Sequence, residues 1–162
     1  MHTFLLAPTS ARVGLTSTSL GLVRALSRAG LSVGFFKAVA QHHSSDDGPE
    51  RSTGLMKLTH HIDAPEPLAL VDVERYIAEH NLDDLLEALV TRFHSAAHDH
   101  DVVIIEGLVP NQQTSYATRV NVALANSLNA EAIIVTAPDD ESAEVLADRI
   151  ALHVQQFGGP DQ

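Results

Sequence analysis

Residues 3–17 read TFLLAPTSARVGLTS, which is a short apolar run, a polar loop and the start of a helical pattern. A strand, a loop and a helix in this order form the setting of the phosphate-binding loop G-x-x-x-x-G-K-[ST]. The second glycine of that motif is present as Gly14 and the hydroxyl as Thr16. The first glycine is replaced by Thr9 and the lysine by Leu15. The loop has therefore lost the charge that would reach the terminal phosphates of a nucleotide.

Strand-like and helix-like segments alternate through the rest of the chain. Continuous apolar runs, such as DVVIIE at residues 101–106, are typical of strands covered on both faces. The alternation predicts an α/β fold with three layers, in which helices cover both faces of a mostly parallel sheet. The expected strands are residues 3–7, 32–38, 101–106 and 131–137, the expected helices are 16–29, 53–58, 72–79, 82–97, 114–128 and 139–157, and 42–52 is expected to be a loop.

Length and composition limit the possible classes of protein. The 162 residues fit a single domain spanning 1–162, with 44% hydrophobic residues to form its core. The chain has no cysteine, which excludes disulfides and fits a cytoplasmic protein. No apolar run is long enough for a membrane span. A net charge of -11 argues against nucleic acid and anionic membranes as partners.

Parallel sheets bind ligands at the carboxyl ends of their strands, where four segments of this chain should meet. These are the first loop, Lys37, Glu106 and the turn at residues 137–139. The predicted anion, nucleotide or effector site comprises Thr9, Ser10, Gly14, Thr16, Ser17 and Lys37. If nucleotide and magnesium bind, Thr16 and Glu106 are the expected metal ligands. The alternatives are an ordinary strand-to-helix turn, a solvated Lys37, and a Glu106 that pairs with Lys37.

The chain contains 10 histidines, and two of them, His94 and His98, are four residues apart on a predicted helix. That spacing suits a shared metal ion. The spacing places no third ligand, so we interpret most histidines as surface residues. No Ser-His-Asp arrangement is apparent from the spacing.

Several motifs together resemble the start of the long bacterial phosphate acetyltransferases. The segment VGLTSTSLGLVRAL at residues 13–26 resembles their opening, and FKAVAQ at 36–41 is similar to their F-K-P-I-A-Q. EGLVP at 106–110 matches their V-E-G-L-V-P, while LNAE at 128–131 and FGG at 157–159 keep the same order. The resemblance covers essentially the whole chain. It implies a P-loop NTPase-like, dethiobiotin synthetase-like domain.

The resemblance also suggests roles for individual residues. Dethiobiotin synthetases and cobyrinate amidases use a loop lysine, a lysine after the second strand and a glutamate after the third to bind ATP, magnesium and substrate. The matching positions are Leu15, Lys37 and Glu106, so two of the three groups are kept. A further carboxylate that helps to hold magnesium in the synthetases would correspond to Glu50 or Asp47. The family proline after the second lysine is Ala38 here.

The resemblance implies that catalysis, acetyl-CoA plus phosphate giving acetyl phosphate plus CoA, belongs to a C-terminal acetyltransferase domain absent from these residues. We therefore expect a regulatory and structural N-terminal domain, cut at its C-terminal sheet edge, in a homo-oligomer. No cofactor is certain; ATP with magnesium, or an effector such as NADH or pyruvate, is the expected ligand. Two alternatives remain, namely an active dethiobiotin synthetase-like ligase using Arg12 for the lost lysine charge, and a ligand-free assembly scaffold.

Overall fold

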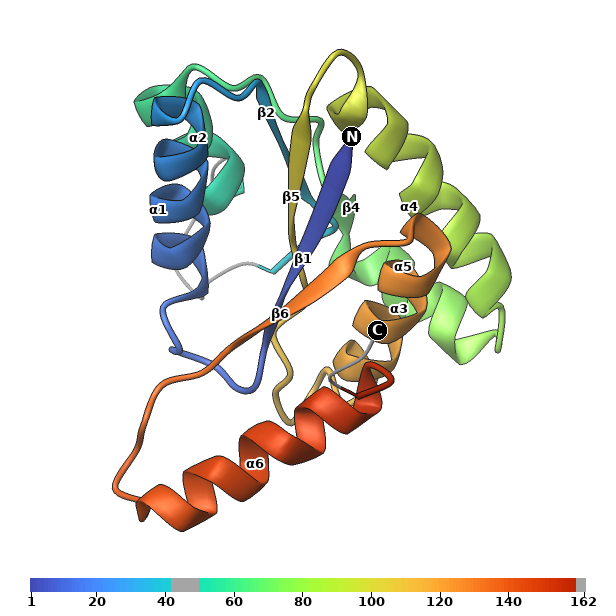
Figure 1. Cartoon of the computed structure of the whole chain (residues 1–162). Helices are drawn as coiled ribbons and strands as arrows, with labels where there is room; N and C mark the ends of the chain where they lie inside the picture. Colours follow the sequence, from blue (N-terminus) through green and yellow to red (C-terminus); the bar gives the residue numbers. More distant parts are fainter. Residues whose placement is uncertain (42–49, 160–162) are drawn as a thin grey trace.

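A parallel four-stranded sheet forms the centre of the molecule (Figure 1). The structure is a computed structural model that describes residues 1–41 and 50–159. The strand order is β2-β5-β1-β6, and each neighbouring pair is parallel. The four strands are β1 (His2–Pro8), β2 (Val33–Lys37), β5 (Val102–Glu106) and β6 (Glu131–Val135). The predicted α/β class with a mostly parallel sheet is confirmed.

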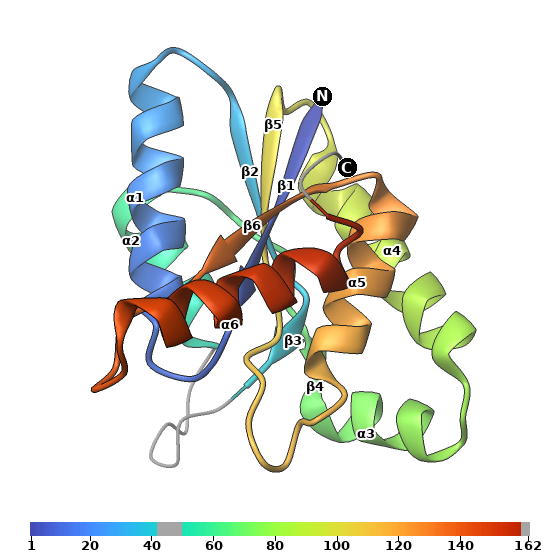
Figure 2. The same cartoon turned by 60° about the horizontal axis from the view of Figure 1, so that its bottom comes forward.

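Helices cover both faces of this sheet, as Figures 1 and 2 show. The helices are α1 (Leu15–Arg28), α2 (Arg51–His60), α3 (Leu70–Ala78), α4 (Leu82–Ala97), α5 (Ala117–Leu128) and α6 (Ala143–Gln156). Helices α1 and α2 lie on one face, and α4 and α5 lie on the other. None of the helices in the described ranges is long and apolar enough to cross a membrane.

The strands contribute alternate residues to two separate hydrophobic clusters, because successive side chains of a strand point to opposite faces. In β5, Val103 and Ile105 pack towards α4 and α5, whereas Val102 and Ile104 pack towards α1. All five residues of β5 are buried. Burial on both faces explains why this segment is apolar without interruption.

The structure adds two short strands that the sequence did not predict and moves several boundaries. Strand β3 (Val39–Ala40) pairs in parallel with β4 (Leu68–Ala69), which makes a small second sheet. Both strands have only two residues, too few for a periodic pattern. The expected loop 42–52 was wrong at its end, because the Glu50 side chain caps α2 and brings Arg51 and Ser52 into that helix. Residues 42–49 lie outside the described residues.

Two other helices begin later than expected because side chains of the preceding loops hold those loops in place. Thr114 bonds to the backbone of Val109 and Asn111, so α5 begins at Ala117 instead of residue 114. The Ser142 side chain accepts a hydrogen bond from the Val145 N–H and caps α6, which starts at Ala143 instead of residue 139.

Close packing between β2 and the end of α4 requires a glycine at position 34. A Cβ atom on Gly34 would clash with the Ala96 carbonyl oxygen and lie 2.7 Å from the His100 ring. The backbone of β2 can approach α4 only because position 34 has no side chain.

We expect Gly34→Ala to destabilise the chain by about 1–3 kcal/mol, the usual cost of overpacking a core. Gly21→Ala is the matched control, since Gly21 lies inside α1 and an added Cβ meets nothing within 4 Å. The control should raise stability by about 0.5–1 kcal/mol through helix propensity. Urea unfolding of both variants checks this, and equal stabilities would contradict the close approach.

Candidate functional site

In the loop between β1 and α1, two residues have positive φ angles and the position of the P-loop lysine is buried. Gly14 precedes α1 in a left-handed conformation with φ 79°, and Arg12 has φ 64°. Leu15 is 7% exposed and belongs to the hydrophobic cluster that contains Val23 and Met56. Leu15 also lines the cavity described below, so the position that would carry the phosphate-binding charge is an apolar part of the cavity wall that packs on the core.

Glu106, at the carboxyl end of β5, lies at the centre of a buried polar cluster. Its side chain is 1% exposed, and its Oε1 lies 2.8 Å from the Lys37 Nζ at the end of β2. The Ser52 hydroxyl donates to Oε1 at 2.7 Å, and the Ser19 hydroxyl donates to Oε2 at 2.7 Å. Thr16 donates to Oε1 at 3.5 Å and lies 3.0 Å from the Ser52 oxygen. The cluster therefore joins β2, β5, α1 and α2.

The cluster keeps Glu106 ionised. Burial by itself would raise the pKa of its carboxyl, because a charged group loses solvation in the interior. The Lys37 charge and the hydrogen bonds from Lys37, Ser52 and Ser19 act in the opposite direction, and together they hold the pKa of Glu106 below its usual value. Charge compensation and hydroxyl donors thus outweigh desolvation.

A cavity of about 440 Å³ opens beside this cluster at the carboxyl ends of the strands. Five of the six predicted binding residues line it, namely Ser10, Gly14, Thr16, Ser17 and Lys37. The sixth, Thr9, is buried and donates a hydrogen bond to the Thr136 hydroxyl at 3.0 Å. The two predicted metal ligands, Thr16 and Glu106, both face this cavity. Their roles stay predictions.

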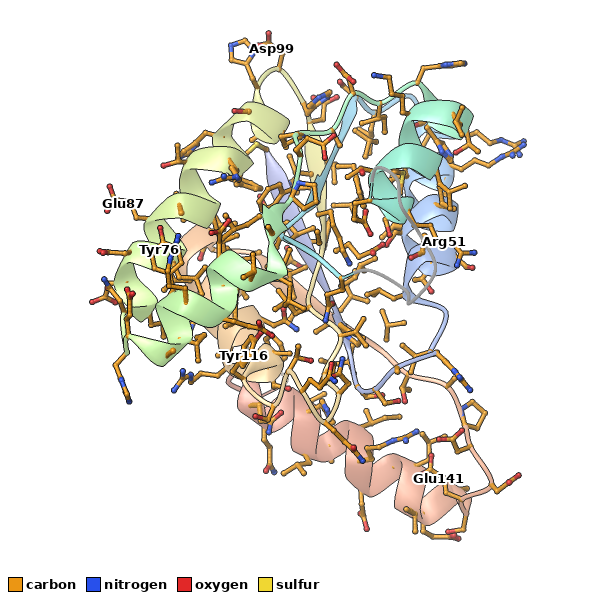
Figure 3. All side chains as sticks on the ribbon, turned by 180° about the vertical axis from the view of Figure 1, so that it is seen from behind. Arg51, Tyr76, Glu87, Asp99, Tyr116 and Glu141 are labelled. Atoms are coloured by element: carbon orange, nitrogen blue, oxygen red, sulfur yellow. The ribbon has the colours of Figure 1, made fainter. Side chains whose placement is uncertain are left out.

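Sequence reasoning missed several residues of the site. Ser19 and Ser52 were not singled out, although they donate the two shortest hydroxyl bonds to Glu106. Arg51, at the first position of α2, lines the same cavity and is exposed (Figure 3). A serine one helical turn after Thr16 was the only available signal for Ser19.

Two side-chain amides hold the backbone that follows Glu106. Asn121 accepts from the Leu108 N–H at 2.8 Å and donates to the Leu108 carbonyl at 2.9 Å. Gln41 makes the same pair of bonds with Val109, at 2.7 and 3.0 Å. These bonds replace the pairing that a neighbouring strand would supply, and they fix the cavity wall.

Among the residues that the structure describes, the histidines form no comparable centre. Within residues 1–41 and 50–159, no group of three or more His, Asp, Glu or Cys side chains is arranged to hold a metal ion. His98 is exposed and lies 2.8 Å from the Asp99 carboxylate.

Comparison with known proteins identifies the family of this chain and supports its fold. A family model described as an AAA domain matches residues 2–158. The chain belongs to this AAA domain family. A solved BceF tyrosine kinase domain matches 98% of the chain and 65% of its own length, with a TM-score of 0.53 and 15% identity. This likeness supports the P-loop NTPase-like fold alone.

Curated relatives of this AAA domain carry the name phosphate acetyltransferase. The Pseudomonas aeruginosa protein is 56% identical over 99% of this chain, and the Pseudomonas putida protein is 54% identical over 99%. The Escherichia coli protein is 36% identical over 96%. The resemblance to this group is confirmed. The chain spans only 23% of the two Pseudomonas proteins and 22% of the Escherichia coli protein.

Removing one partner of the buried ion pair should be costly. We expect Lys37→Met to lower the free energy of unfolding by about 3–5 kcal/mol, because Glu106 is left buried without its counter-charge. The double variant Lys37→Met with Glu106→Gln should lose less than the two single losses added together. Urea unfolding of the four proteins measures the coupling, and strictly additive losses would argue against a direct pair.

The lowered pKa of Glu106 predicts an acid dependence of stability. The ionised carboxylate stabilises the fold fully above the ordinary glutamate pKa of about 4.3, and this contribution declines as pH falls through the lower folded-state pKa. The stability advantage of the wild type over Glu106→Gln should therefore be constant near neutral pH and shrink in acid. Urea unfolding across this pH range checks the trend, and an advantage that grows in acid would refute it.

Proposed function

We propose that this chain is the N-terminal, ligand-responsive domain of a phosphate acetyltransferase and is not catalytic by itself. The parent reaction is acyl transfer between acetyl-CoA and phosphate, in a C-terminal domain within a homo-oligomer. Support comes from the name of the curated relatives and from the minor share of their length that the chain matches.

The absence of catalysis is proposed because neither of the two lysines expected at such a nucleotide site is free to act on a ligand. The loop lysine is Leu15, buried in a hydrophobic cluster. The remaining lysine, Lys37, is 3% exposed and engaged by Glu106 at 2.8 Å. Phosphoryl transfer relies on cations placed against the transferred group, so this arrangement favours binding without chemistry.

Ligand binding is supported by the cavity that remains. Its lining includes Arg12 and Arg51, and both residues are exposed. Within the described residues, neither of them forms an ion pair. Arginine suits phosphate and carboxylate groups. An anionic metabolite such as NADH, pyruvate or a nucleotide matches this lining.

One observation favours the second candidate, an ATP-dependent ligase that binds magnesium. Thr16, Glu50 and Glu106, whose side chains carry oxygen atoms, line the same cavity. Hard oxygen ligands and substrate phosphates are what magnesium prefers. A ligand-free assembly scaffold is the third outcome of the experiment below.

Thermal melting of this chain with ATP and magnesium, NADH, pyruvate, acetyl-CoA or phosphate separates the candidates. A ligand at 100 times its Kd should stabilise the fold by about 2.7 kcal/mol. We expect a shift with NADH or pyruvate that does not need magnesium. A shift only with ATP and magnesium would favour the ligase, and no shift with any compound would favour the scaffold.

Arg51→Ala tests whether the shift comes from this cavity. The variant should reduce the ligand-dependent melting shift, because it removes a cavity cation. Arg24→Ala is the matched control, since Arg24 is an exposed arginine of α1 that does not line the cavity. Equal melting shifts in the two variants would indicate that the ligand binds at another site.

A further inference from the structure

The turn between β6 and α6 lies at the same edge of the sheet as the cavity beside Glu106. Residues 136–142 form this turn and follow the carboxyl end of β6. None of the described residues that line the cavity comes from the turn. The sequence places residues 137–139 at the ligand edge, and the contact of this turn with the cavity is therefore indirect.

Arg149, in the middle of α6, holds the turn together. Its Nη2 donates to the Ala137 carbonyl at 2.9 Å and to the Thr136 hydroxyl at 3.2 Å. The same nitrogen lies 2.6 Å from the Glu141 Oε1, in an ion pair whose side chains are 23% and 16% exposed. Glu141 lies just before the start of α6 (Figure 3). One guanidinium nitrogen therefore contacts three oxygen atoms of the same turn.

The hydrogens of this nitrogen are used by the turn itself. A guanidinium Nη carries two N–H bonds. The Glu141 Oε1 receives no hydrogen bond within the described residues, although it is the nearest of the three oxygens. The two N–H bonds therefore go to Thr136 and Ala137, and Glu141 contributes its charge.

Thr136 connects the turn to the first loop. The Thr9 hydroxyl donates to the Thr136 hydroxyl at 3.0 Å, and the Thr9 N–H donates to the Val135 carbonyl at 3.0 Å. Thr9 is buried and directly precedes Ser10, which lines the cavity. Hydrogen bonds therefore run from Arg149 on α6 through Thr136 to Thr9 at the start of the cavity wall.

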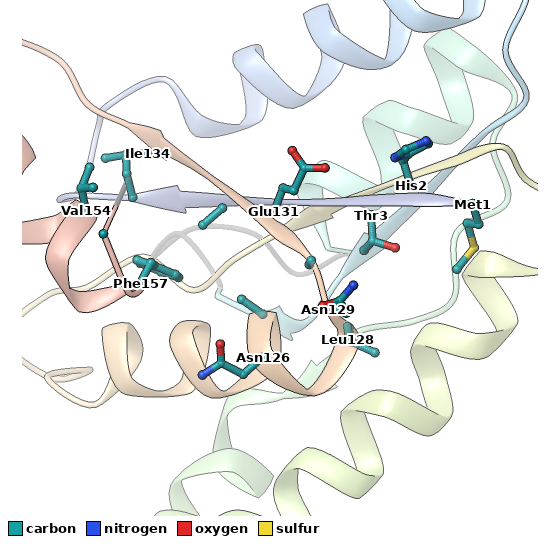
Figure 4. A pocket seen from close by; sticks show the side chains of 14 residues that line it. Met1, His2, Thr3, Asn126, Leu128, Asn129, Glu131, Ile134, Val154 and Phe157 are labelled. Atoms are coloured by element: carbon teal, nitrogen blue, oxygen red, sulfur yellow. The ribbon is translucent and has the colours of Figure 1, made fainter. Parts of the chain in front are cut away.

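Helix α6 is the least buried helix of the described ranges. It has no buried residue, whereas each of α1 to α5 has at least one. Phe157, at its carboxyl end, packs against the hydrophobic cluster on the α4 and α5 side. Phe157 also lines a cavity at the amino ends of the strands, together with Thr3 and Glu131 (Figure 4). The other half of α6 lies towards the carboxyl ends, where Arg149 supplies a partly buried polar contact.

We propose that Arg149 is a positioning residue for the cavity beside Glu106, acting through Thr136 and Thr9 on the loop that contacts the anion. This inference rests on the proposed function, because it concerns an anionic metabolite in that same cavity. Arg149 is not among the described lining residues, so it acts on the ligand only through the shape of the loop. Coupling between two sites is reciprocal, so a ligand that fixes the loop also holds α6 in place.

Amide hydrogen exchange without ligand tests the hydrogen-bonded path. We expect the Thr9 amide to exchange at least about fivefold faster in Arg149→Met, since coupling between sites is typically about 5–150-fold. The rate is taken relative to the Ile104 amide in β5, which corrects for a change in global stability. Arg24→Met is the matched control, an exposed arginine of α1 outside the cavity lining. An unchanged relative rate at Thr9 would overturn the proposal.

Two further variants separate positioning from a general loss of stability. Arg149→Lys keeps the charge and carries three N–H bonds on one nitrogen, so it should restore much of the Thr9 protection. Thr136→Val removes the connecting hydroxyl at nearly constant volume, and it should reproduce the effect of Arg149→Met. Adding Arg149→Met to Thr136→Val should then cost little more, because both act on one path. Fully additive effects would contradict that path.

NADH binding tests the consequence for the ligand. In Arg149→Met the Kd for NADH should rise at least about fivefold. In the wild type, NADH should slow exchange of the Leu146 amide, which bonds to the Ser142 carbonyl in the first turn of α6. An equal Kd in both proteins would overturn the positioning role. A wild type that binds no NADH would contradict the expected effector of the proposed function instead, and Thr9 exchange would still decide whether Arg149 positions the loop.

Discussion

The buried ion pair between Lys37 and Glu106 is the constraint around which the carboxyl edge of the sheet is organised. Lys37 ends β2 and Glu106 ends β5, and these strands are neighbours with the two residues in direct register. Removing two charges from water is costly, and the pair is tolerable only when further hydrogen bonds satisfy the remaining lone pairs. Ser19 from α1 and Ser52 from α2 supply them. The electrostatic requirement of one carboxylate therefore fixes how two helices sit on the sheet.

The same pair determines what the neighbouring cavity can do. A lysine that neutralises a buried carboxylate is not available to a ligand unless the carboxylate finds another cation. With Leu15 in the core, the cavity retains Arg12 and Arg51 as cations without an ion-pair partner among the described residues. The cavity therefore keeps cationic residues in its lining but has an apolar side chain at the position of the P-loop lysine.

The two edge strands of the sheet differ in burial. All five residues of β2 are buried, whereas only Val135 of the five residues of β6 is buried. Burial on both faces and at both edges is expected for an apolar parallel strand, yet β6 has this environment only on its β1 side. The cavity beside Glu106 lies at the carboxyl ends of the strands, whereas the cavity lined by Thr3, Glu131 and Phe157 lies at their amino ends, so the two are separate surfaces of one domain.

The sequence by itself determined the α/β class, the four main strands and the approximate helices, because burial on both faces demands uninterrupted apolar runs and helices demand their own periodicity. It also determined that Gly14, Thr16, Lys37 and Glu106 belong to one sheet edge, since parallel strands end together. Only the tertiary structure decided that Leu15 faces the core, that Ser19 and Ser52 complete the shell of Glu106, and that β3 pairs with β4. These outcomes depend on contacts between residues far apart in the chain, and a local pattern carries no information about which partner a hydroxyl, a charge or a two-residue strand will meet.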